Sequence, residues 1–156
     1  MDLRFLALGA VLSDIVDLPI GVPLWERFET VRLFGHTMLF GVLLMIVVLM
    51  VTRRGLWRKR LILLPIGVLM HLGLDAMWQS PETLWWPFLG AEFAPAGIAS
   101  YGSYAIDVLT DPLMWLGEAV GLVYLVALWE KAGLGVSVNF RRFVASGVVS
   151  APIDPS

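Results

Sequence analysis

The chain contains no cysteine, few charged residues and little net charge, and each shortage excludes a class of protein. Without cysteine there is no disulfide framework, no thiolate zinc site and no thiol nucleophile. Charged residues make up 15% of the 156 residues, below the roughly one quarter that is typical of soluble domains. The net charge of -2 provides no basic surface for a nucleic acid, so no nucleic-acid partner is expected. The chain is instead rich in hydrophobic residues, which make up 58% of it.

Four apolar stretches are long enough to cross the hydrocarbon core of a membrane, which takes about 20 residues of helix. They lie at about residues 3–22, 31–52, 61–78 and 105–129, and the clearest contains "MLFGVLLMIVVLMV". We therefore expect an all-α integral membrane protein with a bundle of four transmembrane helices in residues 1–132. Residues 133–156 are expected to form a cytoplasmic tail that is partly disordered, above all at "SAPIDPS".

The basic segment "TRRGLWRKR", residues 52–60, predicts how these helices are oriented. Short loops rich in Lys and Arg stay on the cytoplasmic side of a membrane. By alternation, both chain termini are cytoplasmic and residues 79–104 lie outside. This outer segment combines tryptophans, phenylalanines and tyrosines with prolines and glycines, and such rings favour the headgroup level. We expect it to form an aromatic-rich extracytoplasmic cap.

Ionisable residues gather toward the outer side of all four predicted helices, at spacings of three, four or seven residues. Such spacings place side chains on one helical face. The residues concerned are Asp14, Asp17, Arg32, His36, His71, Asp75, Asp107, Asp111 and Glu118. An isolated charge near the bilayer centre costs about 2.5–3.5 kcal/mol on insertion scales, so these groups need compensation. Mutual hydrogen bonds, a water-filled cavity or a divalent cation could supply it.

On this outer side carboxylates outnumber basic residues, and only Arg32 and Arg27 are available to pair with them. Surplus acids with two histidines indicate a metal site, since imidazole and carboxylate suit zinc, manganese or iron. Other interpretations stay open. The aspartates can act as independent helix caps, and acids with histidines can form a proton or cation pathway. The cluster can also join helices in a non-enzymatic, partner-binding membrane protein. No serine lies in a G-x-S-x-G elbow, which argues against a serine nucleophile.

Three blocks of this sequence resemble a known family. The blocks are "GAVLSDIVDLPIG", "RLFGHTMLF" and "HLGLDAMWQSPETLWWPFLG", within about residues 9–90. They resemble the signature blocks of the membrane-bound metal-dependent hydrolase family, the YdjM-like proteins of bacteria and archaea. The resemblance implies a multi-pass protein of the prokaryotic inner membrane with a divalent-metal site. Its ligands in this chain would be Asp14, Asp17, His36, His71 and Asp75. Ser13 and Leu18 stand where the family usually has proline and lysine.

The main functional hypothesis is a metal-dependent hydrolase, with zinc as the first choice of metal and manganese or iron as alternatives. Asp111 or Glu118 would act as general base or would orient a ligand histidine. The predicted site opens at the outer headgroup level, so the expected partner and substrate is a membrane lipid or a lipid-linked phosphoester. A looser similarity to zinc phospholipase C enzymes, which also carry H-x-x-x-D pairs on helices, points to phosphodiester chemistry. The oligomeric state is left open.

Overall fold

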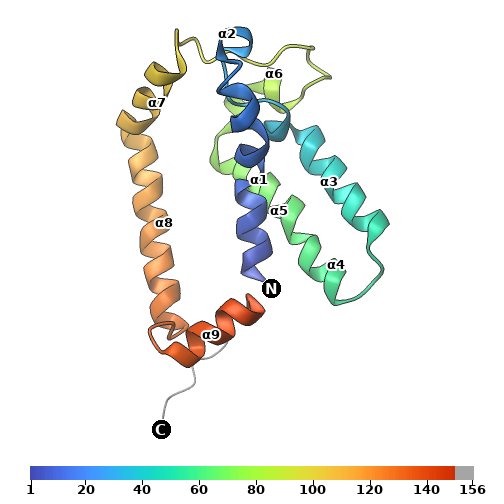
Figure 1. Ribbon diagram of the computed structural model, residues 1–156, viewed down its shortest axis with the longest axis vertical. Coiled ribbons are helices and arrows are strands. Elements are labelled where there is room, and N and C mark those ends of the chain that lie inside the picture. The colour runs from blue at the N-terminus through green and yellow to red at the C-terminus, as the bar shows by residue number, and fades with distance from the viewer. Residues whose placement is uncertain (150–156) are drawn as a thin grey trace. The chain divides into compact units, whose positions relative to one another are not determined.

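The computed structural model describes residues 1–149, apart from the side chain of Leu113, and within this range the chain is α-helical with no β-strand. The first elements are α1 (Leu3–Gly21), α2 (Trp25–Phe28), the 3-10 turn η1 (Phe34–His36), α3 (Met38–Val51), α4 (Leu56–Leu61) and α5 (Leu63–Leu74). They are followed by η2 (Met77–Gln79), α6 (Pro81–Leu84), α7 (Tyr101–Thr110), α8 (Pro112–Lys131) and α9 (Ser137–Ser146) (Figure 1). The all-α class is therefore confirmed.

The chain forms two compact units. One comprises residues 4–104, with α1 to α6, and it contains the candidate site described below. The other comprises residues 1–3 and the chain from residue 105 onward. In this second unit, the backbone amide of Leu3 donates to the carbonyl oxygen of Gly147 at 2.7 Å. This bond ties the start of the chain to the residue that follows α9.

Helices α1 and α5 come into backbone contact because glycines stand where they meet. A Cβ added to Gly9 would lie 2.2 Å from a carbonyl oxygen of α5, and one added to Gly67 would lie 2.4 Å from a carbonyl oxygen of α1. Both separations are far below van der Waals contact, so no larger residue fits unless a helix moves. Asp14 follows Gly9 along α1, and His71 follows Gly67 along α5. The glycine contact thus determines how closely these two side chains approach each other.

Helix α3 begins at Met38, seven residues later than the predicted helix of 31–52. Thr37 is extended, with φ of -98° and ψ of 149°, and its side chain accepts a hydrogen bond from the amide of Phe40 at 3.0 Å. A threonine in this conformation with this bond is an N-cap, which satisfies one of the free amides of the first turn. His36 therefore lies in a turn before the helix, and its predicted place inside a helix of residues 31–52 was wrong.

We expect Thr37→Ala to destabilise the protein by about 1 kcal/mol, because the amide of Phe40 loses its acceptor at the start of α3. Thr37→Ser keeps the hydroxyl and should retain most of this stability. Thermal unfolding of the purified protein in detergent measures both variants. An equal loss in Thr37→Ser and Thr37→Ala would show that packing of the methyl group matters here and that capping does not.

The third and fourth predicted helices are interrupted. Helix α5 gives way to η2 at Ala76, which has a left-handed φ of 51°. Helices α7 and α8 are bent by 58° at the break around Asp111. The cause is Pro112, since a proline disfavours helical geometry at the residue before it and is well suited to open a new helix. The spacing of four residues predicted that Asp107 and Asp111 share one continuous helix. In the structure they do not, because α7 ends at Thr110.

Among the described residues, the length and apolar character needed to cross a membrane are not combined in any single helix, whereas the bent pair Tyr101–Thr110 and Met114–Lys131 meets both together. The number of membrane spans stays a prediction. Large apolar side chains are nevertheless exposed along α3 and α8. They include Val42, Leu43, Ile46, Val47, Met50 and Val51 on α3, and Leu116, Val120, Leu122, Val123 and Leu125 on α8.

Segments predicted as loop or tail contain further helices. Helix α4 forms inside the basic segment 52–60, and α9 forms inside the predicted tail. The predicted disorder of "SAPIDPS" falls on residues 150–156, which lie outside the described residues.

The predicted aromatic cap is organised around α6. The hydroxyl of Thr83 accepts a hydrogen bond from the amide of Ala94 at 2.8 Å, which ties Ala94 to this short helix. The rings of Trp86 and Phe93 stack with centroids 5.4 Å apart. Other aromatic rings of the segment are exposed, namely Trp85 and Phe88.

Candidate metal centre

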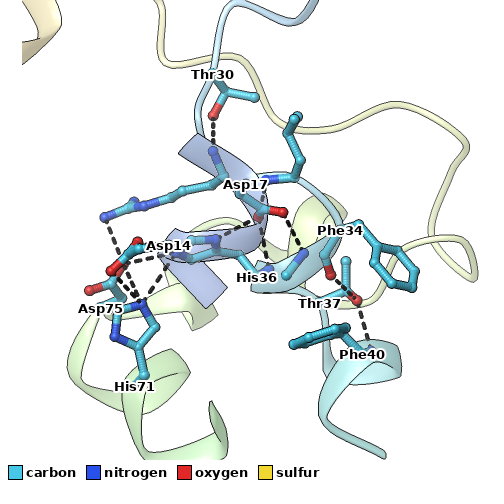
Figure 2. Close-up of polar contacts among 12 residues, drawn as sticks. Asp14, Asp17, Thr30, Phe34, His36, Thr37, Phe40, His71 and Asp75 are labelled. Carbon is cyan, nitrogen blue, oxygen red and sulfur yellow. Dashed lines mark hydrogen bonds and ion pairs between the residues drawn. The ribbon is translucent and has the colours of Figure 1, made fainter. Parts of the chain in front are cut away.

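Asp17, near the end of α1, is fully buried and positions the turn that precedes α3 (Figure 2). Its Oδ2 accepts hydrogen bonds from the backbone amides of Leu33 at 2.7 Å and His36 at 3.2 Å, and its Oδ1 accepts one from Gly35 at 2.7 Å. Burying a carboxylate is costly unless it is hydrogen-bonded, and here three amides meet that need. A Cβ on Gly35 would lie 2.7 Å from the carbonyl oxygen of Ser13, so the turn packs this closely only with glycine.

The same carboxylate sets the orientation of the His36 ring. Nδ1 of His36 lies 2.8 Å from Oδ2 of Asp17, and the imidazole is 2% exposed. With the proton on Nδ1 donated to Asp17, the lone pair is left on Nε2. Histidines that bind metals are commonly held this way, by a carboxylate that fixes the tautomer and the ring orientation. Asp17 thus prepares Nε2 of His36 to act as a ligand atom.

Three side chains from α1, η1 and α5 converge at this Nε2 (Figure 2). Nε2 of His71 lies 3.3 Å from Nε2 of His36. The carboxylate of Asp14 lies 3.4 Å from Nε2 of His36 and 3.7 Å from Nε2 of His71. One ligand atom from each of the three lies within 4.8 Å of the other two. Neighbouring ligands of a four-coordinate zinc stand about 3.3 Å apart, given bonds of about 2.0–2.1 Å, so these spacings fit a small divalent cation.

Asp75, the residue after α5, brings a second carboxylate to the edge of this group. Its Oδ2 lies 3.6 Å from Nε2 of His36 and 3.9 Å from Nε2 of His71. The same oxygen lies 3.5 Å from a guanidinium nitrogen of Arg32. Asp75 is therefore placed between the histidine pair and a basic side chain. We refer to Asp14, His36, His71 and Asp75 as the His-Asp cluster.

The charges of the cluster also fit a cation. Two imidazole nitrogens and the carboxylates of Asp14 and Asp75 face one another, while Arg32 contributes one positive charge at the edge. Nitrogen lone pairs and carboxylates converge here with too few N–H or O–H groups to pair them. Such groups are the ligands of borderline divalent metals such as zinc. The residues present thus satisfy both the spacing and the chemistry that such an ion requires.

The five ligands predicted from the sequence all lie in the unit of residues 4–104, but they are not equivalent. Asp14, His36, His71 and Asp75 form the His-Asp cluster. Both oxygens of Asp17 are engaged by backbone amides and by His36. The spacing of three residues had placed Asp14 and Asp17 on one face as equal ligands. In the structure Asp17 supports His36 from behind, and its predicted role as a direct ligand is untested.

Asp107, Asp111 and Glu118 belong to the other unit, where their side chains are exposed. The assignment of Asp111 or Glu118 as general base stays a prediction. The second role proposed for them, orienting a ligand histidine, is filled for His36 by Asp17.

Tyr104 was predicted only as one of the aromatic residues of the cap, and not as a neighbour of the site. Its ring packs on that of Trp25, with centroids 5.3 Å apart. The phenol lies close enough to Arg32, Asp75 and Asp14 for their charges to act on it. No helical spacing links position 104 to these residues, because the chain between η2 and α7 is mostly irregular. Only the fold brings Tyr104 within range of these charges.

The α-helical fold and the convergence of two histidines and two aspartates place this chain among helical proteins with a candidate divalent-metal centre. The model of the YdjM inner membrane protein family matches residues 1–144, and the chain belongs to this family. The match confirms the family predicted from three sequence blocks, and with it a protein of the inner membrane. It does not address hydrolysis. Comparisons with curated proteins and with solved structures gave no match.

Proposed function

We propose that this chain is a membrane-embedded, metal-dependent hydrolase that cleaves a lipid or lipid-linked phosphoester at the outer headgroup level. The observation that carries the proposal is the convergence of Asp14, His36 and His71 within 4.8 Å, together with the Asp17 hydrogen bond to Nδ1 of His36. A site that existed only to join helices would not need a buried carboxylate that directs one imidazole nitrogen at two other ligand atoms.

Each residue of the cluster has a distinct proposed role. Asp14, His36 and His71 would hold the ion, with Asp75 as a fourth ligand and Asp17 as the residue that positions His36. Zinc suits this donor set best, and manganese or iron are alternatives. When bound, the cation supplies Lewis-acid chemistry, which activates water and polarises a phosphoryl oxygen. Asp111 or Glu118 remains the proposed general base.

The proposal includes four membrane-spanning helices in residues 1–132, with both chain termini in the cytoplasm. Three observations support this arrangement: the membership of an inner membrane family, the basic segment at 52–60 and the exposed apolar side chains of α3 and α8. In this arrangement the site opens outward beside residues 79–104. A substrate delivered from the lipid phase is then the most direct choice.

The first test is metal content. Protein purified in detergent, stripped with a chelator and reloaded with zinc is expected to retain about one equivalent, which is what one four-ligand site holds. His36→Ala and His71→Ala should each lose most of it. Glu82→Gln on α6, where the side chain is exposed, removes one carboxylate away from the cluster and should leave the zinc content unchanged. Zinc content that does not differ between wild type and His71→Ala would refute the proposed site.

The second test separates binding from turnover. Zinc-loaded protein in vesicles should release the phosphoryl product from a phosphoester lipid, and the rate should fall to background in His71→Ala. Zinc binding without hydrolysis of any phosphoester lipid would retain the metal site and reject the hydrolase. Proton or cation flux in vesicles that is lost in Asp75→Asn would favour the alternative of a relay or transport protein.

A further inference from the structure

Arg32 occupies a fixed position beside the His-Asp cluster. Its neighbour Leu33 donates its backbone amide to Asp17, and its own amide donates to the hydroxyl of Thr30 at 3.1 Å. Thr30 is buried. The backbone is therefore held on both sides of Arg32, while the side chain, 37% exposed, extends to the cluster. Such an arrangement fixes the point from which the guanidinium reaches Asp75, beside the cluster.

The ion pair that Arg32 forms there is loose. Its guanidinium nitrogen lies 3.5 Å from Oδ2 of Asp75, and both side chains are partly exposed. A tight charge-assisted hydrogen bond between such groups measures about 2.7–2.9 Å. A guanidinium has five N–H donors in a planar fork. Within residues 1–149, this single ion pair leaves most of those donors available to a ligand.

Arg32 and the histidines lie within the reach of one oxyanion, and Oδ2 of Asp75 occupies the position between them. Oδ2 of Asp75 is 3.5 Å from the guanidinium nitrogen and 3.6 Å from Nε2 of His36, so those two nitrogens are at most about 7 Å apart. A single phosphate group can bridge a cation held at the histidines and a guanidinium at this separation. The fork of the guanidinium matches two oxygens of one phosphate.

Charge explains why the basic residue is needed. With a divalent cation bound, the charges of Asp14, Asp17, Asp75 and Arg32 together with the ion balance. Without Arg32 the loaded site would carry a net negative charge and would repel an anion.

We propose that Arg32 is the anion-binding residue of this site and that the group it receives is the phosphate of the substrate. The inference rests on the proposed function, whose metal site would bind the other side of the same phosphate. It assigns a binding residue to the phosphate of the proposed phosphoester substrate and excludes neutral esters and amides as substrates.

The test is binding of inorganic phosphate to zinc-loaded protein in detergent, measured by equilibrium dialysis. Arg32→Gln is expected to weaken binding by roughly 10- to 100-fold, the range for losing hydrogen bonds between charged partners. Arg32→Lys keeps the charge but loses the fork, so it should bind with intermediate affinity. The control is Arg27→Gln on α2, which removes an exposed arginine that lies over the Phe28 ring and should not alter binding. Zinc content and unfolding temperature of each variant report whether the fold is intact.

Phosphatidic acid in mixed micelles provides the second arm. Tighter Arg32-dependent binding of phosphatidic acid than of inorganic phosphate identifies a lipid headgroup as the source of the phosphate. Equal Arg32-dependent affinities identify a water-soluble phosphoester. Equal phosphate affinity in wild type and Arg32→Gln, or equally tight binding of succinate, overturns the inference. Arg32-dependent phosphate binding by a protein that retains no zinc would uphold Arg32 and reject the proposed metal site, so the two failures are distinguishable.

Discussion

Asp17→Asn is expected to lower both the stability of the protein and its affinity for zinc. An asparagine keeps one carbonyl oxygen but presents an NH2 group where the second carboxylate oxygen was. In one orientation the NH2 group faces the amide of Gly35, and in the other it faces the amides of Leu33 and His36, which then have no acceptor. One unpaired buried donor costs about 1–3 kcal/mol. Asp17→Ala removes both acceptors and should cost about 3 kcal/mol or more.

The zinc affinity of Asp17→Asn should fall by about 10- to 100-fold, the range found when a carboxylate that supports a metal-bound histidine is lost. The matched variant is Asp14→Asn. Asp14 is half-exposed, with 42% of its side chain accessible, and no backbone amide of the described residues is shown donating to it. Asp14→Asn should therefore lose zinc with little change in unfolding temperature. Titration with zinc and thermal unfolding, both in detergent, separate the two residues. If Asp17→Asn unfolded normally and lost zinc completely, Asp17 would be a direct ligand and the orienting role would be wrong.

Gly67→Ala is expected to force α1 away from α5. The added Cβ would lie 2.4 Å from a carbonyl oxygen and 2.7 Å from an amide nitrogen of α1, and neither backbone atom can turn aside. Overpacking of this kind costs roughly 1–3 kcal/mol, and more where backbone must move. Because Asp14 lies on α1 and His71 on α5, the separation of 3.7 Å between their ligand atoms should increase as well. Zinc affinity should then fall along with stability.

Helix α5 contains its own control for this prediction. A Cβ added to Gly73 would meet nothing within 4 Å. Gly73→Ala should therefore be neutral or should stabilise the helix by up to about 1 kcal/mol, since alanine is the better helix former. Thermal unfolding and zinc titration of both variants test the contact between α1 and α5. Equal unfolding temperatures for Gly67→Ala and Gly73→Ala would mean that the two helices are not held at this distance.

Much of the candidate site could be predicted because its residues are rare in an apolar chain. The chain has only two histidines, and His71 with Asp75 follows the helical spacing that brings side chains onto one face. The order of three motif blocks also predicted the family, which the match over residues 1–144 confirms. These inferences need only local periodicity and composition, and both can be read directly from the chain.

The helix boundaries were predicted less well, for identifiable reasons. The apolar run from residue 31 indicated a helix, yet the α-helix begins only at Met38, because Asp17 accepts the amides of Leu33, Gly35 and His36 and Thr37 caps the helix that follows. The continuous helix predicted across Asp111 ignored the constraint that Pro112 places on the residue before it. Hydropathy measures how apolar a segment is, and it does not register a hydrogen bond or a proline that ends a helix.

The sequence by itself determined the helical class, the membrane family and the set of histidines and aspartates from which a metal centre can be built. Only the tertiary structure decided which role each of those residues has. It turned Asp17 toward the backbone of a segment sixteen to nineteen positions later, and it left Asp14 facing the two histidines. It also brought Arg32 to Asp75, 43 positions away in the chain. Contacts of this range are set by the packing of α1 against α5 and by the buried hydrogen bonds of one carboxylate, and no periodicity along the chain encodes them.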